Sequence, residues 1–558
     1  MPPVSPRFGV ALSVLALTAL SVGCTGAPAP APGGGGDAAS AGSGAAAAPA
    51  VNRVVFITTP PARALLEVRH MAEPYNLMIR PMHEYLIDVN EKTGKLEPGL
   101  ATEWSYEPSG NALRVKLRQN VPFHKNGGTL TADDVKFGWE QVTLPDSLTG
   151  QAPYWRRVAK SIDVVNDNEL LFNTAGPDGN IVAAISEEQS GVEVQSRASF
   201  TKNGPATYKT GPYNGTGPYQ YADGAEGVFI RYDRVPYKHW RAMPDFPELE
   251  LRFAKEASTR QAALLAGEAH IAQLPEDLLN QSLKQGMKTV RATFPGVRVW
   301  GTIHCCYVND VDDDSKGWKF PDSPLMDVRV RKAINKSINR DEINKALYGG
   351  KGELMIVNHQ APNRPGWNPN WEKTFKDDYG YDPAAAKKLL ADAGQPSLKT
   401  TVYVQPVAGL AGGEDLAEAV GGYMRAVGIN VEMVTVDAAD FTNKKRTLIY
   451  GNGVSFAATG SNIWSGYTIW NSALGTRGNY ESMKVNHVLQ QLEKAIDQNK
   501  REELWRQAGD LAYAEYMNVN LFSLPVELAV NPKVVSDWAF PGAITGSYTH
   551  MFNIKAAK

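Results

Sequence analysis

One segment of the chain gathers side chains suited to holding a small molecule. Residues 453–477 combine aromatic rings with small and amide side chains. The candidates for ligand contact are Phe456, Trp464, Tyr467, Trp470 and Arg477. Aromatic faces offer apolar contact area, and Arg477 offers a charged donor to a carboxylate or else stays a solvated loop cation. The segment shows no clean helical or strand period, so we predict a loop lining a cleft, with core packing as the alternative.

The chain carries none of the motifs that mark common enzyme sites. It has no G-x-S-x-G, no P-loop and no convincing pair of carboxylates. Its nine His residues show neither H-x-x-x-H nor H-E-x-x-H spacing, so we expect no metal site and no cofactor. His124 follows Phe123 in a turn, where we expect it to bond the backbone. The run 312–314 of three Asp residues is expected to be an exposed acidic loop. These patterns predict a binding protein rather than an enzyme.

Three Cys residues are too few for a disulfide framework. Cys305 and Cys306 are adjacent and follow His304. They could form a vicinal disulfide, bind a soft metal with His304, or be two separate thiols in a strand. Because successive strand side chains point to opposite faces, we expect two separate thiols.

The N-terminus has the pattern of an export signal. Residues 8–22 form an apolar run that is too short to span a membrane as a settled helix but suits a secretory signal. Ser21-Val22-Gly23-Cys24 follows and resembles a lipobox. We therefore expect a signal peptide over 1–23 and a lipid anchor on Cys24, with an ordinary secreted protein as the alternative. Residues 24–50, mostly Ala, Gly and Pro, are expected to be a flexible tether.

Composition and charge limit the remaining classes. The formal net charge is −2 and no run of Lys or Arg stands out, which argues against a nucleic-acid partner. Hydrophobic residues make up 43% of the chain, and no second long apolar span occurs. Roughly 500 ordered residues exceed what one core supports, so we expect a globular protein of several lobes.

Helices with clear start and stop signals recur along the chain. We predict helices over 257–267, 327–338, 339–349, 381–394 and 501–516, and a helix followed by a strand over 416–441. Asp327, Asn339 and Asp382 stand where an N-cap is needed. Gly349 and Gly394 stand where a helix must end. Short apolar strands are expected near 54–57 and 521–524.

Residues 96–142 carry an ordered series of short motifs. They are Pro98-Gly99-Leu100-Ala101, Trp104, Leu117-Arg118, Val121, Phe123-His124 and Leu130-Thr131-Ala132-Asp133-Asp134-Val135. In order and spacing the series resembles the start of the family 5 extracytoplasmic solute-binding proteins, the receptors of peptide- and nickel-type ABC importers. Similar blocks, including Gly217-Pro218-Tyr219 and the stretch that begins at Asp327, recur from about Glu97 to Val526.

The resemblance implies an α/β fold of the type II (cluster C) periplasmic-binding-protein kind. Two α/β lobes and an inserted smaller lobe would surround a ligand cleft. The expected boundaries are 51–95, 216–303 and 521–558 for lobe I, 96–215 for the inserted lobe II, and 304–520 for lobe III. Two strand-like crossings, near Ile303 and Leu521, would form the hinge.

The resemblance also bears on ligand contacts. Phe456-Ala457-Ala458-Thr459 falls on the family's Trp-x-Ala-Asp pattern, in which the Asp of peptide-binding members pairs with the ligand's ammonium group. Thr459 is neutral, so peptide binding would need a substitute such as Asp437 or Asp440. Tyr85, with His83, lies where a turn of lobe I would line the cleft.

The function implied is capture of an oligopeptide or a similar polar solute by hinge closure, with delivery to an ABC permease that is coupled to a cytoplasmic ATPase. Alternatives are a receptor for a non-peptide solute (a sugar, an opine-like compound or a metal chelate) and an exported sensor or chaperone. We expect a monomer outside the cytoplasm, in the periplasm or at the cell surface, held at the membrane through Cys24.

Overall fold

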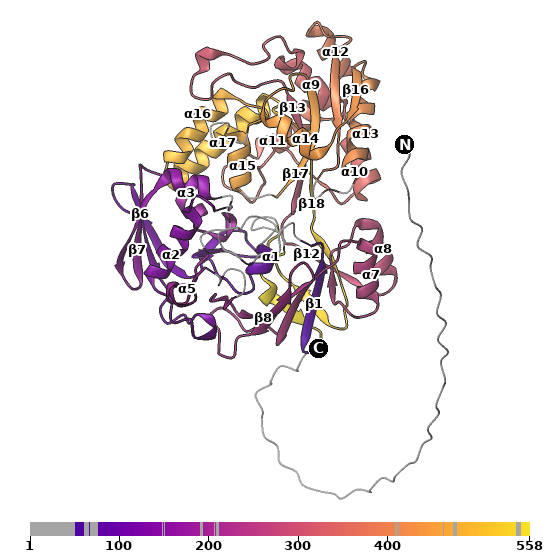
Figure 1. Ribbon diagram of the computed structural model, residues 1–558. Coiled ribbons are helices and arrows are strands. Elements are labelled where there is room, and N and C mark those ends of the chain that lie inside the picture. Colours follow the sequence, from indigo (N-terminus) through magenta and orange to yellow (C-terminus); the bar gives the residue numbers. More distant parts are fainter. Residues whose placement is uncertain are drawn as a thin grey trace, which may run out of the picture. The chain divides into compact units, whose positions relative to one another are not determined.

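The computed structural model describes residues 51–60, 66, 76–147, 149, 151–189, 193–205, 207, 211–407, 410, 412–460, 463–471, 477–542 and 548–558. The signal peptide, Cys24 and the tether predicted from the sequence lie outside these residues. Three larger sheets organise the compact unit Ala48–Lys558, and Figure 1 labels some of their strands, among them β1, β7 and β13. Within the described part of the chain, no helix has the length and apolar character needed to cross a membrane.

Lobe I is built on a seven-stranded mixed sheet. Its strands, in spatial order, are β12 (Lys288–Arg291), β19 (Glu527–Val530), β11 (Ile271–Ala272), β1 (Arg53–Thr58), β10 (Glu248–Phe253), β9 (Phe229–Arg234) and β8 (Tyr219–Ala225). On β1, Val54 and Phe56 face one core, whereas Val55 and Ile57 pack on the side of α7 (Ala257–Leu265) and α8 (Glu276–Lys284). Because both faces are covered, the strand is a continuous apolar run. The short helix α1 (Asn76–Ile79) and the pair β20 (Val535–Trp538) and β21 (Ile554–Ala556) complete this lobe.

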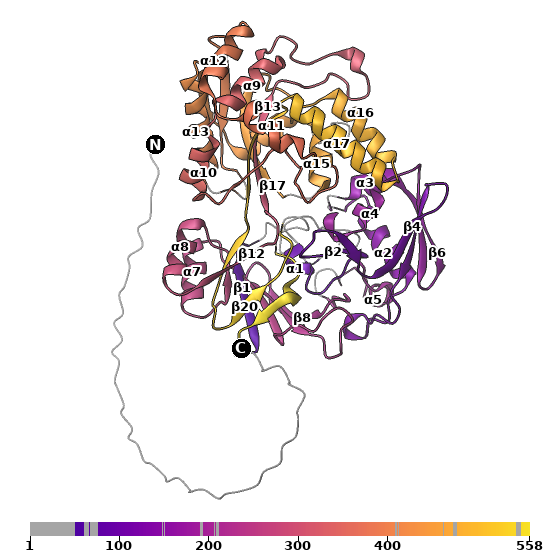
Figure 2. The same cartoon turned by 180° about the vertical axis from the view of Figure 1, so that it is seen from behind.

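Lobe II is an antiparallel sheet with helices on one face (Figure 2). Its strands, in spatial order, are β4 (Ala101–Tyr106), β5 (Ala112–Leu117), β7 (Glu169–Thr174) and β6 (Ala159–Asn166). Its helices are α2 (Ala132–Thr143), α3 (Ala152–Val158), α4 (Ile181–Ala184) and α5 (Arg197–Asn203). A hairpin of β2 (Ile87–Val89) and β3 (Leu96–Pro98) leads into it. Thr131 and Asp134 form the capping box that starts α2, as the motif at that position requires.

Lobe III contains a six-stranded sheet. Its strands, in spatial order, are β14 (Glu353–Leu354), β18 (Asn518–Leu524), β13 (Val297–His304), β17 (Gly453–Thr459), β15 (Lys399–Val404) and β16 (Asn430–Thr435). Its helices are α9 (Val328–Ser337), α10 (Arg340–Tyr348), α11 (Asn370–Tyr379), α12 (Pro383–Asp392), α13 (Gly413–Ala426), α14 (Ala438–Arg446), α15 (Ile463–Trp470), α16 (Met483–Lys494) and α17 (Gln498–Ala514). The predicted N-caps Asp327, Asn339 and Asp382 each accept a bond from a backbone N–H in the following helix. The α/β class and the capped helices are confirmed.

The chain passes between the sheets of lobes I and III at residues 292–296 and 525–526. The two passages are bonded to each other, since Ala292 N donates to Val526 O (3.0 Å) and Gly296 N to Leu524 O (2.9 Å). Ile303 and Leu521 lie inside β13 and β18, so the crossings are several residues from the expected positions. An apolar strand has the same pattern in either sheet, which is why the sequence did not locate the passage.

Two expectations about local structure are wrong. Residues 453–477 are not a loop throughout, because they contain the strand β17 and the helix α15. The strand's apolar face is diluted by small residues, and the helical spacing of Ile463, Tyr467 and Trp470 is partly masked by neighbouring apolar side chains. Cys305 and Cys306 form a vicinal disulfide rather than two separate thiols. β13 ends at His304, so the pair lies in the turn after the strand, where alternation no longer separates neighbouring side chains.

The turn at residues 215–219 holds lobes I and II together. His124 bonds the carbonyl of Gly217 through Nε2 (2.8 Å), and His239 bonds that of Thr216 (2.8 Å). A Cβ on Gly215 would lie 1.8 Å from the carbonyl oxygen of Met82, so the backbones approach more closely than any side chain allows. The structural role predicted for His124 is confirmed.

Candidate functional site

A cavity of about 470 Å³ lies beside the passage between lobes I and III. It is lined by residues 293–295, Arg298, residues 353–356, residues 360–364, Trp367, Glu372 and Ser523. The passage residues and the start of β13 thus share a wall with the loop that precedes α11. A solute held here would contact the segments that must move when the lobes open or close.

β13 presents a polar face next to this cavity. Along the strand, Arg298, Trp300, Thr302 and His304 alternate with Val299, Gly301 and Ile303, and Val299 and Ile303 enter the core of lobe III. The register with β17 places Thr459 opposite Arg298 and Ser455 opposite Thr302. One face of the sheet is therefore apolar and packed, and the other carries hydrogen-bonding groups.

The two ends of the polar face differ in how well they are satisfied. At one end, the ring of His304 bonds Tyr307 Oη (2.7 Å) and Ser455 Oγ (2.8 Å). Towards the other end, several buried atoms have no hydrogen-bond partner among the described residues. They are Arg298 Nε and Nη1, Trp300 Nε1, Thr302 Oγ1, Asn358 Oδ1, both ring nitrogens of His359, Thr459 Oγ1, Trp470 Nε1 and Asn520 Oδ1. Buried polar groups in proteins are normally paired with protein groups, water or a ligand, so these atoms make this face a candidate site for a bound solute.

Arg298 is the most costly member of this group. Its side chain is 2% exposed, and no described residue bonds its guanidinium group. Burial, and secondarily the charge of Arg364, lowers the pKa of Arg298 to about 9, so the group stays protonated at neutral pH. A buried cation without a partner costs several kcal/mol.

Arg364, a second buried cation at the cavity, is paired. Its Nη1 lies 2.8 Å from Glu188 Oε1, and both side chains are 7% exposed. Glu188 belongs to a short 3-10 turn (Glu187–Gln189) that follows lobe II's helix α4. The ion pair therefore joins lobe II to the loop of lobe III that lines the cavity.

The predicted ligand contacts fall on different sides of the sheet. Thr459 lies on the polar face, opposite Arg298. Phe456 points the other way, is buried in the core of lobe III and approaches Gly301. Asp437 and Asp440 lie at the start of α14, and Asp440 pairs with Lys444 there.

α15 carries three of the predicted contacts. Tyr467 is buried and its hydroxyl donates to Glu493 Oε2 (2.9 Å). Trp470 is buried, 6.3 Å from the ring of His359. The backbone of Trp464 belongs to this helix, but its side chain lies outside the described residues. Of the predicted contacts, Trp470 and Thr459 thus belong to the group with unpaired atoms. Trp470 lies near His359, and Thr459 lies on the same face of the sheet as Trp300.

Arg477 and Tyr85 are engaged with protein groups. Arg477 pairs with Glu481 (2.7 Å) and donates to a backbone carbonyl. Tyr85 is 2% exposed and its hydroxyl donates to Glu193 Oε1 (3.1 Å). Burial raises the pKa of both Tyr85 and Glu193 well above their ordinary values. His83, beside Tyr85, is also buried and contacts the carbonyl of Val194.

The sequence reasoning missed Arg298, Trp300 and His359. A signal was present, because residues 297–304 read Val-Arg-Val-Trp-Gly-Thr-Ile-His, with polar or aromatic residues at every second position. An Arg in a strand that is apolar on its other face indicates a charge brought into the interior for a purpose. His359 has no such signal in the sequence, since only the fold brings it to β13.

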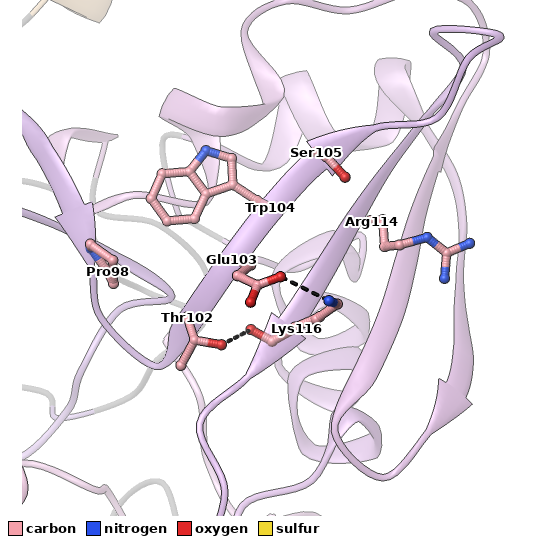
Figure 3. Close-up of a pocket in the computed structure, with 7 residues that line it drawn as sticks. All are labelled: Pro98, Thr102, Glu103, Trp104, Ser105, Arg114 and Lys116. Carbon is pink, nitrogen blue, oxygen red and sulfur yellow. Dashed lines mark hydrogen bonds and ion pairs between the residues drawn. The ribbon is translucent and has the colours of Figure 1, made fainter.

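A second cavity, also of about 470 Å³, lies over β4 and β5 of lobe II (Figure 3). Its polar groups already pair with one another, since Lys116 Nζ lies 2.8 Å from Glu103 Oε2 and both side chains are more than half exposed. None of the described residues that line this cavity has a buried polar side-chain atom without a partner. Among the described residues, no group of three His, Cys, Asp or Glu side chains could hold a metal ion.

One family model and several known proteins match this chain in sequence. The family model described as "Bacterial extracellular solute-binding proteins, family 5 Middle" matches residues 95–481. Heme-binding protein A of Haemophilus influenzae is 26% identical over 393 residues, which span 67% of this chain and 68% of the relative. Dipeptide-binding protein of Escherichia coli is 24% identical over 475 residues, or 78% of this chain and 82% of the relative.

Among solved structures, the fold is similar to that of the ABC transporter-associated periplasmic binding protein DppA from Helicobacter pylori in complex with the peptide STSA. The TM-score is 0.69 at 20% sequence identity, and the match covers 91% of this chain and 98% of the other. At this identity the likeness concerns the fold. The predicted arrangement of two α/β lobes with a smaller inserted lobe is confirmed.

Proposed function

Because the chain belongs to the bacterial extracellular solute-binding proteins of family 5, we propose that it captures a peptide or another medium-sized polar solute by closing its lobes around it. It then delivers the solute to the permease of an ABC importer. The cavity beside the passage between lobes I and III, with the buried guanidinium group of Arg298 in its lining, is the observation that carries the proposal. Two connected passages allow the lobes to rotate as units while the chain between them stays bonded.

Contacts between lobes support a closed arrangement. Lys351, just after α10, lies 2.7 Å from both Glu276 of α8 and Glu527 of β19, and so joins lobe III to lobe I. Lobe II meets lobe III where Gly179 N donates to Glu493 O (2.7 Å) and where Arg501 Nη2 donates to Asn180 Oδ1 (2.8 Å). Each of these contacts must break when the lobes separate. A solute that bridges the lobes would shift the equilibrium towards them.

A non-peptide solute is a second candidate, and Thr459 favours it. The residue offers a hydroxyl where binding an ammonium group calls for a carboxylate. The relatives named above bind chemically different ligands by their names, namely heme and dipeptides. Specificity in such a fold belongs to a few side chains of the cleft.

The test is a thermal-shift screen of residues 51–558 against peptides with free and blocked N-termini, sugars, metal chelates and organic acids. A solute at a hundred times its dissociation constant adds about 2.7 kcal/mol to the folded state. Small-angle scattering with the active solute should then show a smaller radius of gyration than without it. A solute that binds with no compaction would contradict capture by closure.

The lipid anchor forms part of the same proposal. Cleavage before Cys24 and lipidation of its thiol would hold the protein outside the cytoplasm on the tether 24–50. To test it, the full chain and its Cys24→Ser variant are expressed with radiolabelled palmitate, and the incorporated label and the membrane-bound fraction of each are compared. Label and membrane association in the full chain, with neither in the variant, is the expected result, and equal association of both would count against the anchor.

A further inference from the structure

The charge of Arg298 has no counterpart in the part of the protein that the structure describes. The cavity's two acidic side chains, Glu353 and Glu372, are exposed at its rim, and Glu353 pairs with Arg291 (3.4 Å). No hydrogen bond or ion pair connects either of them to Arg298. The neighbouring cation Arg364 is matched by Glu188 and adds repulsion rather than relief.

A buried Arg elsewhere in the same lobe shows what a structural role looks like. Arg340 is 5% exposed, and its guanidinium group donates five hydrogen bonds, four of them to backbone carbonyls and one to Asn335 Oδ1. Arg298 is more deeply buried, and its guanidinium group bonds no described residue. Arg340 therefore links structural elements through hydrogen bonds, whereas the donors of Arg298 are available to a bound molecule.

The residues around Arg298 extend the same demand. Thr459 stands opposite it in the register, where paired side chains lie about 5 Å apart, and its hydroxyl is unpaired. The indole nitrogens of Trp300 and Trp470 are unpaired as well, and an indole N–H, like a guanidinium N–H, can only donate. The described residues thus leave four donor atoms unpaired here, two on Arg298 and one on each indole. The unpaired atoms that can only accept are two, Asn358 Oδ1 and Asn520 Oδ1. The local excess is therefore of donors, which oxygen atoms of an anion satisfy.

His359 connects these groups. Its ring lies 5.4 Å from that of Trp300 and 6.3 Å from that of Trp470, and both of its nitrogens are unpaired. Its backbone has a φ of +61°, a conformation that non-glycine residues adopt at a cost and that often accompanies functional sites. The three rings are buried and none of them lines the cavity, so they add unpaired nitrogens beside the site rather than form its walls. The walls of the cavity itself include Phe294, Met355 and Trp367.

We propose that the solute is an organic oxyanion, whose carboxylate or phosphate group pairs with Arg298 while Thr459 donates to it. The inference rests on the proposed function and names the solute class for that site. The planar fork of a guanidinium group fits two oxygens of one oxyanion, which gives both affinity and orientation. The cavity that Arg298 lines is walled in part by Phe294, Met355 and Trp367, which suit an apolar or unsaturated body.

Binding is tested with probes that share a phenyl body and differ in the charge and geometry of their polar head. Phenylacetate, phenyl phosphate and the neutral phenylacetamide are titrated by thermal shift and calorimetry into residues 51–558 and into the Arg298→Gln variant. We expect an acid to stabilise the wild type while the amide does not, and to lose at least about 30-fold in affinity in the variant. The two acids distinguish a carboxylate site from a phosphate site. Response to the amide alone, or an undiminished response in the variant, would overturn the proposal.

A second measurement needs no ligand. Thr459→Asp places a carboxylate opposite Arg298, whereas Thr459→Asn changes shape in the same way without charge. If Arg298 lacks a partner, the Asp variant melts several degrees above the Asn variant and no longer binds the acids. Equal melting of the two variants would overturn the proposal. If no solute of the broader screen binds while Asp still outperforms Asn, the receptor function fails and the unmatched charge stands.

Discussion

Replacement of Arg298 by Met should make the ligand-free protein more stable. Met keeps most of the apolar volume of the Arg stem and removes the charge. Burial lowers the pKa of Arg298 to about 9, which corresponds to roughly 5 kcal/mol against the charged side chain. Replacing a buried ion pair by apolar residues is often neutral or stabilising by 1–4 kcal/mol. Because Arg298 has no described partner to lose, we expect a gain of about 2–4 kcal/mol.

Arg340→Met is the matched control. Burial lowers the pKa of Arg340 as well, to about 10, so the two side chains have lost similar hydration. Arg340 differs in its five hydrogen bonds. Their loss removes a donor from buried oxygens, including the backbone carbonyl oxygens of Asn520 and Tyr379. Each such loss costs about 1–3 kcal/mol. We therefore expect Arg340→Met to destabilise the protein by about 3–5 kcal/mol.

The assay is differential scanning calorimetry of both variants and the wild type without ligand. For a compact unit of about 500 residues the unfolding entropy is about 1 kcal/mol/K, so 1 kcal/mol shifts the melting temperature by about 1 °C. Arg298→Met should melt at least about 2 °C above the wild type, and Arg340→Met at least about 3 °C below it. If Arg298→Met falls as far as Arg340→Met, Arg298 has a partner in the folded protein and the reasoning is wrong.

Three further predictions follow from particular contacts. Gly215→Ala should lower the free energy of unfolding by more than about 4 kcal/mol. Gly422→Ala, on an exposed and open face of α13, should raise it by about 0.5–1 kcal/mol, and thermal melting of both variants measures the difference. Burial lowers the pKa of both His83 and His124 to about 4, below the usual 6.5, so the unfolded chain binds more protons in acid. Stability present above pH 6.5 should therefore fall by about 3 kcal/mol for each as the pH drops towards 4, and a flat melting profile over that range would disagree. Lys351→Met removes two ion pairs between lobes III and I and should favour the open form by about 1–2 kcal/mol, with a smaller effect at high salt. Small-angle scattering should then give a larger radius of gyration. An unchanged radius would mean that these ion pairs do not hold the lobes together.

Much of the fold follows from local signals in the sequence. The capped helices α9, α10 and α12 form where their terminal residues predict, because an N-cap and a terminating Gly act over a single turn. The passages at 292–296 and 525–526 could not be located in the same way. A strand's pattern reports which of its faces is buried but not the sheet to which it belongs.

The site was predicted less completely, and for a related reason. Aromatic content picked out α15, yet it could not say that Tyr467 would bond Glu493 while Trp470 would keep a free indole nitrogen. Arg298 and Thr459 are about 160 positions apart, and only the antiparallel register of β13 and β17 makes them neighbours. Which polar groups lack partners is a property of the three-dimensional structure, and composition cannot report it.

The polar face of β13 shows how stability and binding divide one strand. Both ring nitrogens of His304 are paired, and through Tyr307 and Ser455 they stabilise that end of the strand. No described residue matches the charge of Arg298, so a closed but empty cleft carries a free-energy cost that an oxyanion would remove. An Asp at position 459 would remove the same cost permanently, and closure would then need no solute. The neutrality of Thr459 is thus what would make closure depend on the ligand, as a receptor that must report occupancy to a permease requires.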